Sequence, residues 1–207
     1  IVAPGGQIDI FSTRSAGELN YPSFSFTQNV NGQTFTAMGT IRLTGRPADG
    51  IPGTLDVTDY FGEHAGAGGA IRIRGGQFEM DNASVIADTI MDVPGAATGI
   101  SAAIAGDIIL TNASSLITEN FGPAGSGAIE LIGRNLRVES GSLIGTSSIE
   151  GDLGLGALGS SGNINVTASE SITVTGTGPF NIRSSIRTEA TGGTGDSGLI
   201  TLSAPTV

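Results

Sequence analysis

Gly-Ala-Ile-Arg-Ile at residues 69–73 and Gly-Ala-Ile-Glu-Leu at residues 127–131 are two copies of a phrase that recurs along the chain. After its glycine, the phrase alternates apolar and other residues, which is the period-two pattern of a half-buried β-strand. Full copies begin at Gly6, Gly39, Gly69, Gly127, Gly162 and Gly198, and a weaker copy begins at Gly99. Successive copies lie 33, 30, 30, 28, 35 and 36 residues apart. This spacing predicts a solenoid, because one such strand cannot bury its apolar side without a neighbouring repeat.

Two further apolar segments follow the phrase in each repeat. The first comes nine or ten residues after the glycine, at Phe78/Met80, Ile108/Leu110, Leu136/Val138 and Ile172/Val174. The second follows a small polar turn, at Val85-Ile86, Leu116-Ile117 and Leu143-Ile144. In the weak copy, we expect Ser101 and Ala103 at the inward positions. Three short strands per repeat predict an all-β, parallel β-helix of about six coils, formed as a single domain by residues 1–207.

Polar residues at equivalent places predict a hydrogen-bonded ladder inside the solenoid. Asn82 and Asn112 each lie thirteen residues after their glycine, and Ser140 has that position in the next repeat. Side-chain amides and hydroxyls stacked at one strand spacing can bond to one another. The regular coils are expected over residues 69–204.

The segment at residues 11–38 interrupts the repeats. It contains Asn31-Gly32 between two alternating runs, which predicts a β-hairpin excursion near residues 20–38. Four of its aromatic residues are candidates for a surface-binding patch: Tyr21, Phe24, Phe26 and Phe35. The alternative is that these rings cover the side of the first coils or join the core there.

Residues 45–68 form a second irregular region, which we expect to be a loop-rich coil. Its ionisable residues Asp56, Asp59, Glu63 and His64 are the densest such group in the chain. Their spacing fits neither an EF-hand nor a zinc signature. A solvated loop is therefore predicted, with no metal ion and no cofactor.

The composition of the chain argues against some classes of binding partner. The net charge is −10 and the pI is about 4.3, which argue against nucleic acid as a ligand. The chain has no cysteine, and its nine basic residues are all arginine. It contains no apolar run of 18 residues, so we do not expect it to span a membrane.

The sequence predicts no enzyme. The carboxylates expected on the outer surface are Glu79, Glu130 and Glu139, and two of them would have to meet on adjacent rungs to form an acid–base pair. Carboxylates on a sheet surface are usually solvated instead. We therefore assign no catalytic residues.

Four longer stretches resemble the repeats of filamentous-haemagglutinin-type exoproteins of two-partner secretion systems: residues 66–73, 109–118, 161–168 and 184–202. The resemblance implies a right-handed β-helix shaft that is secreted with the help of an outer-membrane transporter. It implies an extracellular or cell-surface location in a Gram-negative bacterium or a cyanobacterium. The family's secretion domain carries an Asn-Pro-Asn-Gly motif that this chain lacks, so the resemblance is to the shaft.

These observations predict a structural or adhesive segment of a fibrous protein. Neither end carries a polar capping segment, so we expect either a longer chain or separate copies that stack end to end as a filament. A host surface or a polysaccharide is the expected ligand, if the segment is adhesive. The alternative from another class is a carbohydrate-binding or polysaccharide-degrading β-helix, of the pectate-lyase or tailspike type.

Overall fold

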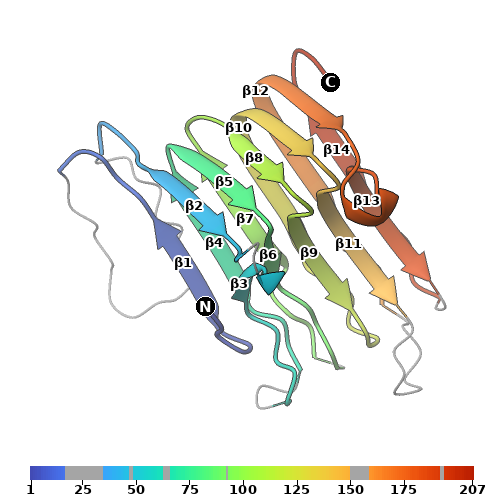
Figure 1. Cartoon of the computed structure of the whole chain (residues 1–207). Helices are drawn as coiled ribbons and strands as arrows, with labels where there is room; N and C mark the ends of the chain where they lie inside the picture. The colour runs from blue at the N-terminus through green and yellow to red at the C-terminus, as the bar shows by residue number, and fades with distance from the viewer. Residues whose placement is uncertain (17–34, 47–48, 63–65, 92, 150–158, 192–193) are drawn as a thin grey trace.

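The computed structural model describes residues 1–16, 35–46, 49–62, 66–91, 93–149, 159–191 and 194–207. These residues form an all-β fold whose only helical turn is η2 (Pro179–Asn181). The strands belong to two sheets, and neighbouring strands within each sheet run parallel (Figure 1). The expected all-β class with parallel strands is therefore confirmed.

Three strand positions recur along the chain. The first lies in the larger sheet and is occupied by β1 (Gln7–Phe11), β4 (Ala70–Gly75), β7 (Thr98–Ile104), β10 (Ala128–Glu139), β12 (Ile164–Thr175) and β14 (Ile200–Ser203). The second lies in the same sheet and is occupied by β2 (Thr40–Thr44), β5 (Gln77–Asp81), β8 (Ile108–Thr111) and the later parts of β10 and β12. The third forms the smaller sheet: β3 (Gly53–Asp56), β6 (Ala83–Ile86), β9 (Ser115–Asn120), β11 (Leu143–Ile149) and β13 (Ser185–Thr191). After each third strand the chain returns to the first position and pairs with the strand of the preceding repeat.

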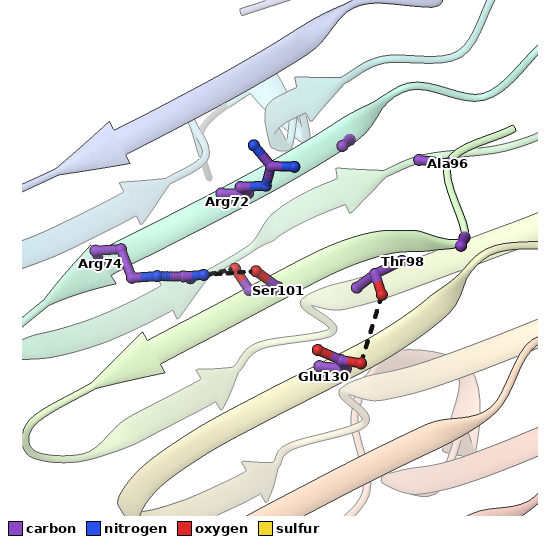
Figure 2. Close-up of a pocket in the computed structure, with 8 residues that line it drawn as sticks. Arg72, Arg74, Ala96, Thr98, Ser101 and Glu130 are labelled. Atoms are coloured by element: carbon purple, nitrogen blue, oxygen red, sulfur yellow. Dashed lines mark hydrogen bonds between the residues drawn. The ribbon is translucent and has the colours of Figure 1, made fainter. Parts of the chain in front are cut away.

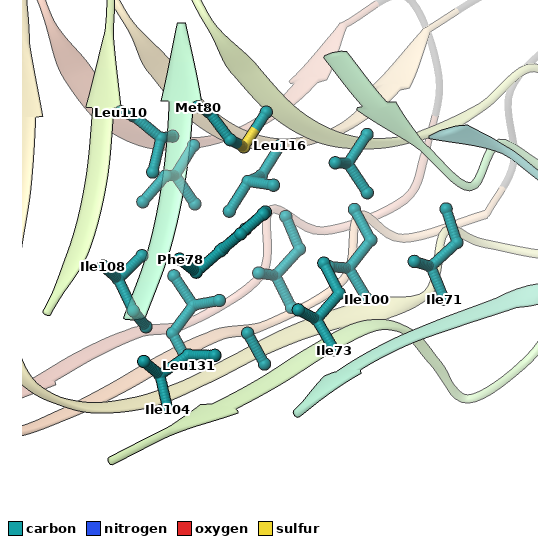
Figure 3. Packing of buried hydrophobic residues seen from close by; sticks show 14 of the residues in the cluster. Ile71, Ile73, Phe78, Met80, Ile100, Ile104, Ile108, Leu110, Leu116 and Leu131 are labelled. Atoms are coloured by element: carbon teal, nitrogen blue, oxygen red, sulfur yellow. The ribbon is translucent and has the colours of Figure 1, made fainter. Parts of the chain in front are cut away.

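Apolar residues stack in columns on the inner side of both sheets. The first column consists of Ile8, Ile71, Ile100, Ile129, Ile164 and Ile200, joined by the registers of their strands. The middle four have no exposed surface. Figure 3 shows this interior, in which Ile71 and Ile100 belong to the same buried cluster as Phe78 of the second strand position. Stacking like on like at one strand spacing fills the interior without voids.

Steric contact between successive repeats explains why the phrase begins with glycine. Gly162 lies directly over Gly127, and a β-carbon at Gly162 would overlap the Gly127 carbonyl oxygen. Gly69 and Gly198 have the same relation to Gly6 and Gly162. At these three levels the chain can therefore begin a new repeat only if this position has no side chain.

A buried threonine in the third strand anchors the same glycines. The Thr118 hydroxyl donates to the Gly127 carbonyl at 2.6 Å, and the Thr146 hydroxyl donates to the Gly162 carbonyl at 2.6 Å. Thr188 repeats this bond to Gly198 at 2.8 Å. Although the loops between these partners differ in length, the anchor is the same in these three repeats, whereas Ala87 and Val57 occupy its position after β6 and β3.

The register corrects two expectations. The phrase at Gly39 does not start a coil, because β2 pairs with β5 in the second strand position. Gly6 and Gly69 therefore delimit one long repeat, and the described strands make five three-strand repeats plus a sixth begun by β14. In β7, Ser101 and Ala103 face outward, whereas Ile100, Ala102 and Ile104 face the core. A one-residue register shift between β7 and β10 accounts for the second difference.

The predicted Asn82/Asn112/Ser140 ladder occupies equivalent backbone positions but is not interior. All three residues have positive φ, of 49°, 52° and 54°, at the turn before the third strand. Asn112 is exposed and its amide bonds to Asp81 at 2.7 Å. The inward ladder is formed by neighbouring serines instead: the Ala83 N–H donates to the Ser114 hydroxyl, and the Ser114 N–H donates to that of Ser142.

The excursion after β1 leaves and rejoins the repeat at an antiparallel bridge between Thr13 and Met38. The Arg14 N–H donates to the Ala37 carbonyl beside it at 2.9 Å. The Asn31-Gly32 turn lies outside the described residues, so the hairpin stays a prediction. No helix in the described ranges is both long enough and apolar enough to cross a membrane.

Candidate functional site

The outer face of the larger sheet carries a row of polar side chains that differ from one repeat to the next. The registers align Asp9 of β1 with Arg72 of β4, then Ser101 of β7 and Glu130 of β10. Alternation along each strand directs these side chains away from the core that their apolar neighbours fill. The row is therefore on the surface, where it can meet a ligand.

The surface is hollowed where this row crosses β4 and β7. A hollow of about 340 Å³ lies between Arg72, Arg74, Thr98, Ser101 and Glu130 (Figure 2). It exists because the remaining lining residues, Ala70, Ala96 and Ala97, are small. A second hollow of about 560 Å³ shares Ala70, Arg72 and Ala96 with the first and extends over residues 5–7, 68–69 and 94–95. We call the two hollows together the arginine groove.

Arg74 lies across the neighbouring strand. One terminal nitrogen, Nη1, donates to the Ile73 carbonyl at 2.8 Å and to the Ser101 carbonyl at 3.1 Å. The other, Nη2, donates to the Ser101 hydroxyl at 3.0 Å, as Figure 2 shows. Burial and, next, the charge of Arg72 lower the pKa of Arg74, while Asp9 and Glu130 oppose that shift. The guanidinium nevertheless stays charged, so its orientation is fixed while its charge is kept.

Arg72 and Arg74 are two residues apart on the same face of β4, which separates their α-carbons by roughly 6.6 Å. On the opposite wall, the Thr98 hydroxyl donates to a Glu130 carboxylate oxygen at 3.4 Å. The Gln7 amide likewise donates to the Asp9 carboxylate at the other end of the row. The groove thus presents two cations among the carboxylate of Glu130, the hydroxyls of Thr98 and Ser101 and the amide of Gln7, with Asp9 next to its edge.

An aromatic pair borders the groove. Phe11, the last residue of β1, is the cross-strand neighbour of Arg74. Its ring centroid lies 5.3 Å from that of Phe35, with the two planes tilted by 52°. Of the predicted aromatic patch, Phe35 is thus placed against the first coil, whereas Tyr21, Phe24 and Phe26 lie outside the described residues.

The acidic region at residues 45–68 is not the solvated loop that the sequence predicts. Asp56 and Asp59 are buried, and Asp59 accepts the Gly66 N–H at 2.9 Å. Asp88 lies nearby, is 5% exposed and accepts the Glu119 N–H at 2.8 Å. Burial, opposed by that hydrogen bond, raises the pKa of Asp88 to about 8.

Glu63 and His64 lie outside the described residues. Among the residues that are described, no three or more potential metal ligands come together. The carboxylates serve as acceptors for backbone N–H groups at the corner between repeats. The Thr58 N–H, for example, donates to Asp56 at 2.8 Å.

The three candidate carboxylates of the outer surface do not meet. Glu79 forms an ion pair with Arg42 at 2.5 Å, and Glu139 forms one with Arg137 at 2.7 Å. The cross-strand neighbours of Glu130 are Ser101 and Asn165. Within the described strands, no two of these carboxylates occupy adjacent rungs as a hydrolytic pair would require.

The main residues of the groove were not among the site residues predicted from the sequence. Ser101 was expected in the core, and Arg72 and Arg74 were not singled out. A signal was nevertheless present, because Arg-Ile-Arg at residues 72–74 is the only place where two basic residues alternate with an inward one. Their proximity to Ser101 and Thr98 depends on the register shift in β7, which the pattern does not encode.

The chain was compared with known protein families, curated proteins and solved structures. No protein family, curated protein or solved structure that was compared matches this chain.

Proposed function

We propose that this chain is a structural segment of a secreted or cell-surface fibrous exoprotein. Its strands would close into a right-handed parallel β-helix that serves as a shaft. Separate copies of the shaft would stack end to end, so that the core columns of one copy meet those of the next. The role is mechanical and, where the outer surface binds a ligand, adhesive.

The observation that carries this proposal is the exposure of the apolar side chains that continue the core columns in the last strands. Ile164 in β12 has no exposed surface, whereas Ile200, one level further along the same column, is 36% exposed. Leu202 and Ile186 are also only partly buried. The last strands thus offer the apolar residues that each earlier strand offers to its next neighbour, and another coil would bury them.

The other end differs. Residues 1–3 run beside β3, where the Ala3 N–H donates to the Asp56 carbonyl at 2.8 Å and the Asp56 N–H donates to the Ile1 carbonyl at 3.0 Å. Leu55 of β3 is consequently 2% exposed. Ile8 and Ile41 on the edge strands of the larger sheet are 6% and 8% exposed. Of the two ends of the sheets, the one formed by β1 to β3 is thus the better covered.

Electron microscopy of the protein isolated from its native source tests this proposal. Five to six layers at about 4.8 Å give a body only roughly 25–30 Å long. A shaft function predicts rods or fibres many times that length. Compact particles no longer than this chain would refute the proposal.

A further inference from the structure

We propose that the arginine groove binds an acidic saccharide, with Arg72 and Arg74 holding the carboxylate of a uronic-acid unit. This inference is independent of the shaft function, because it concerns only the outer face of β1, β4, β7 and β10. The ligand class follows from three features of the groove: its paired cations, its hydrogen-bonding walls and its aromatic border.

The paired arginines favour an anion. Two guanidinium groups lie on neighbouring outward positions of one strand and line the same hollow, and Arg74 is already half-buried against Ser101. A ligand carboxylate placed between them accepts charge-assisted hydrogen bonds, for which the planar guanidinium is well suited. Because Ser101 fixes Arg74, little side-chain freedom remains to be lost when the ligand binds.

The polar side chains that flank the two arginines can form hydrogen bonds with the hydroxyls of a sugar. Asp9 and Glu130 are the acidic groups that act on Arg74, and they keep the site from being a uniform basic patch. Such a site is poorly matched to a dense polyphosphate, which needs several cations in a row. Carboxylate oxygens accept hydrogen bonds from sugar hydroxyls, and the Thr98 hydroxyl and the Gln7 amide lie beside them. A saccharide with one carboxylate per ring and several hydroxyls satisfies both kinds of group.

The shape and the border indicate a chain rather than a single sugar. The two hollows of about 340 and 560 Å³ join through Ala70, Arg72 and Ala96, so the groove is longer than one residue's site. Phe11 is the cross-strand neighbour of Arg74 and packs on Phe35, so an aromatic pair lies next to the hollow, and aromatic rings pack well on the apolar side of a sugar ring. A linear oligouronate would place its carboxylate on the arginines and its neighbouring rings along the small-residue floor.

Titration calorimetry on the 207-residue chain tests the proposal with an oligogalacturonate as the probe. The matched control ligand is the same oligosaccharide with its carboxyl groups reduced to alcohols. We expect binding of the oligogalacturonate that weakens as salt is added. Arg72→Gln should weaken it by about tenfold or more, which corresponds to the loss of one charge-assisted hydrogen bond. Arg74→Gln should do the same if its fold, checked by circular dichroism, is intact.

Arg187→Gln is the control variant, because Arg187 is an exposed arginine on β13 in the other sheet. It should bind the probe like the unchanged chain. Three results would overturn the proposal: no binding of the oligogalacturonate, equal binding of its reduced form, or an equal loss in Arg72→Gln and Arg187→Gln. None of these results would affect the fibre length that tests the shaft function.

Discussion

The two faces of the larger sheet differ in how much they repeat. On the inner face, one column holds isoleucine at six successive levels. On the outer face, the adjacent row changes at every level and reads Asp9, Arg72, Ser101, Glu130, Asn165 and Thr201. Inner residues pack on their own equivalents, so a change at one level disturbs the next. Outer residues do not pack on their equivalents in this way, so their identity can change from level to level and form a binding site without altering the fold.

The largest expected effect comes from a charge on the inner face. Ile129→Asp would bury an unpaired carboxylate at a residue with no exposed surface, which should cost more than about 4 kcal/mol and prevent folding. Ile132→Asp is the control on the outer face of the same strand, where the side chain is 56% exposed. Circular dichroism and thermal unfolding should separate the two. If both variants unfold, or neither does, the assignment of faces is wrong.

A carboxyl group at the buried corner should make stability depend on pH. The pKa of Asp88 is about 8 in the folded chain, against 3.8 as its ordinary value. Between about pH 4 and 8 the folded chain therefore keeps a proton that the unfolded chain releases. Stability should fall as the pH rises through this window, by at most about 1.4 kcal/mol per pH unit. Chemical denaturation across the window measures the slope.

Asp88→Asn should remove that slope, since the amide oxygen can still accept the Glu119 N–H. An ion pair on the surface should give a pH dependence of stability with the opposite sign. Arg134, by its hydrogen bond, lowers the pKa of Asp107, so the small stabilisation from that pair is present near neutral pH and is lost as the pH falls. A slope that is unchanged in Asp88→Asn would show that another group is responsible.

The glycine column should tolerate no side chain. Gly162→Ala would drive a methyl group into the Gly127 carbonyl and should destabilise the chain by about 1–3 kcal/mol. Gly145→Ala is the matched control, because the nearest atom there is the flexible end of Leu143 at 3.3 Å. Urea unfolding gives both values, and equal effects would contradict the close stacking of successive repeats.

The smallest expected effect concerns the threonine anchor. Thr146→Val keeps the shape but removes the bond to the Gly162 carbonyl, so it should cost about 1 kcal/mol, the net contribution of one hydrogen bond. Thr167→Val on the exposed face of β12 should change stability by less than about 0.5 kcal/mol. If the anchor matters less than the exposed threonine, the return to each new repeat is fixed by the glycine alone.

Much of the inner face could be predicted from the sequence. Pairs such as Phe78/Met80 and Leu136/Val138 are buried as expected, because a period-two apolar pattern reports directly on the side facing the core. The phrase at Gly39 misled the count of coils. Its glycine stacks in the second strand position, where a β-carbon at Gly76 would approach the Gly39 carbonyl at 3.2 Å, so the same local pattern serves two places in one repeat.

The outer face could not be predicted to the same extent. The hollow beside Arg72 depends on the small residues Ala70, at the start of β4, and Ala96, in the segment before β7, lying at the same place, and that depends on the path of the chain and the register of the two strands. The burial of Asp59 had a similar cause, because its acceptor role depends on the path of the corner that brings Gly66 to it. Polar letters alone do not distinguish a solvated loop from a buried turn in which backbone N–H groups are satisfied.

The most direct test of the account is nuclear magnetic resonance of the chain with labelled isoleucine methyl groups. Parallel stacking at about 4.8 Å predicts contacts from the Ile129 methyl to both Ile100 and Ile164, and none from Ile132 to any of the three. An unbroken series of such contacts from Ile71 to Ile164 would establish the inner column. An Ile129 methyl that contacts only one of its two neighbours, or that contacts Ile132 instead, would contradict the stacked repeats on which the account depends.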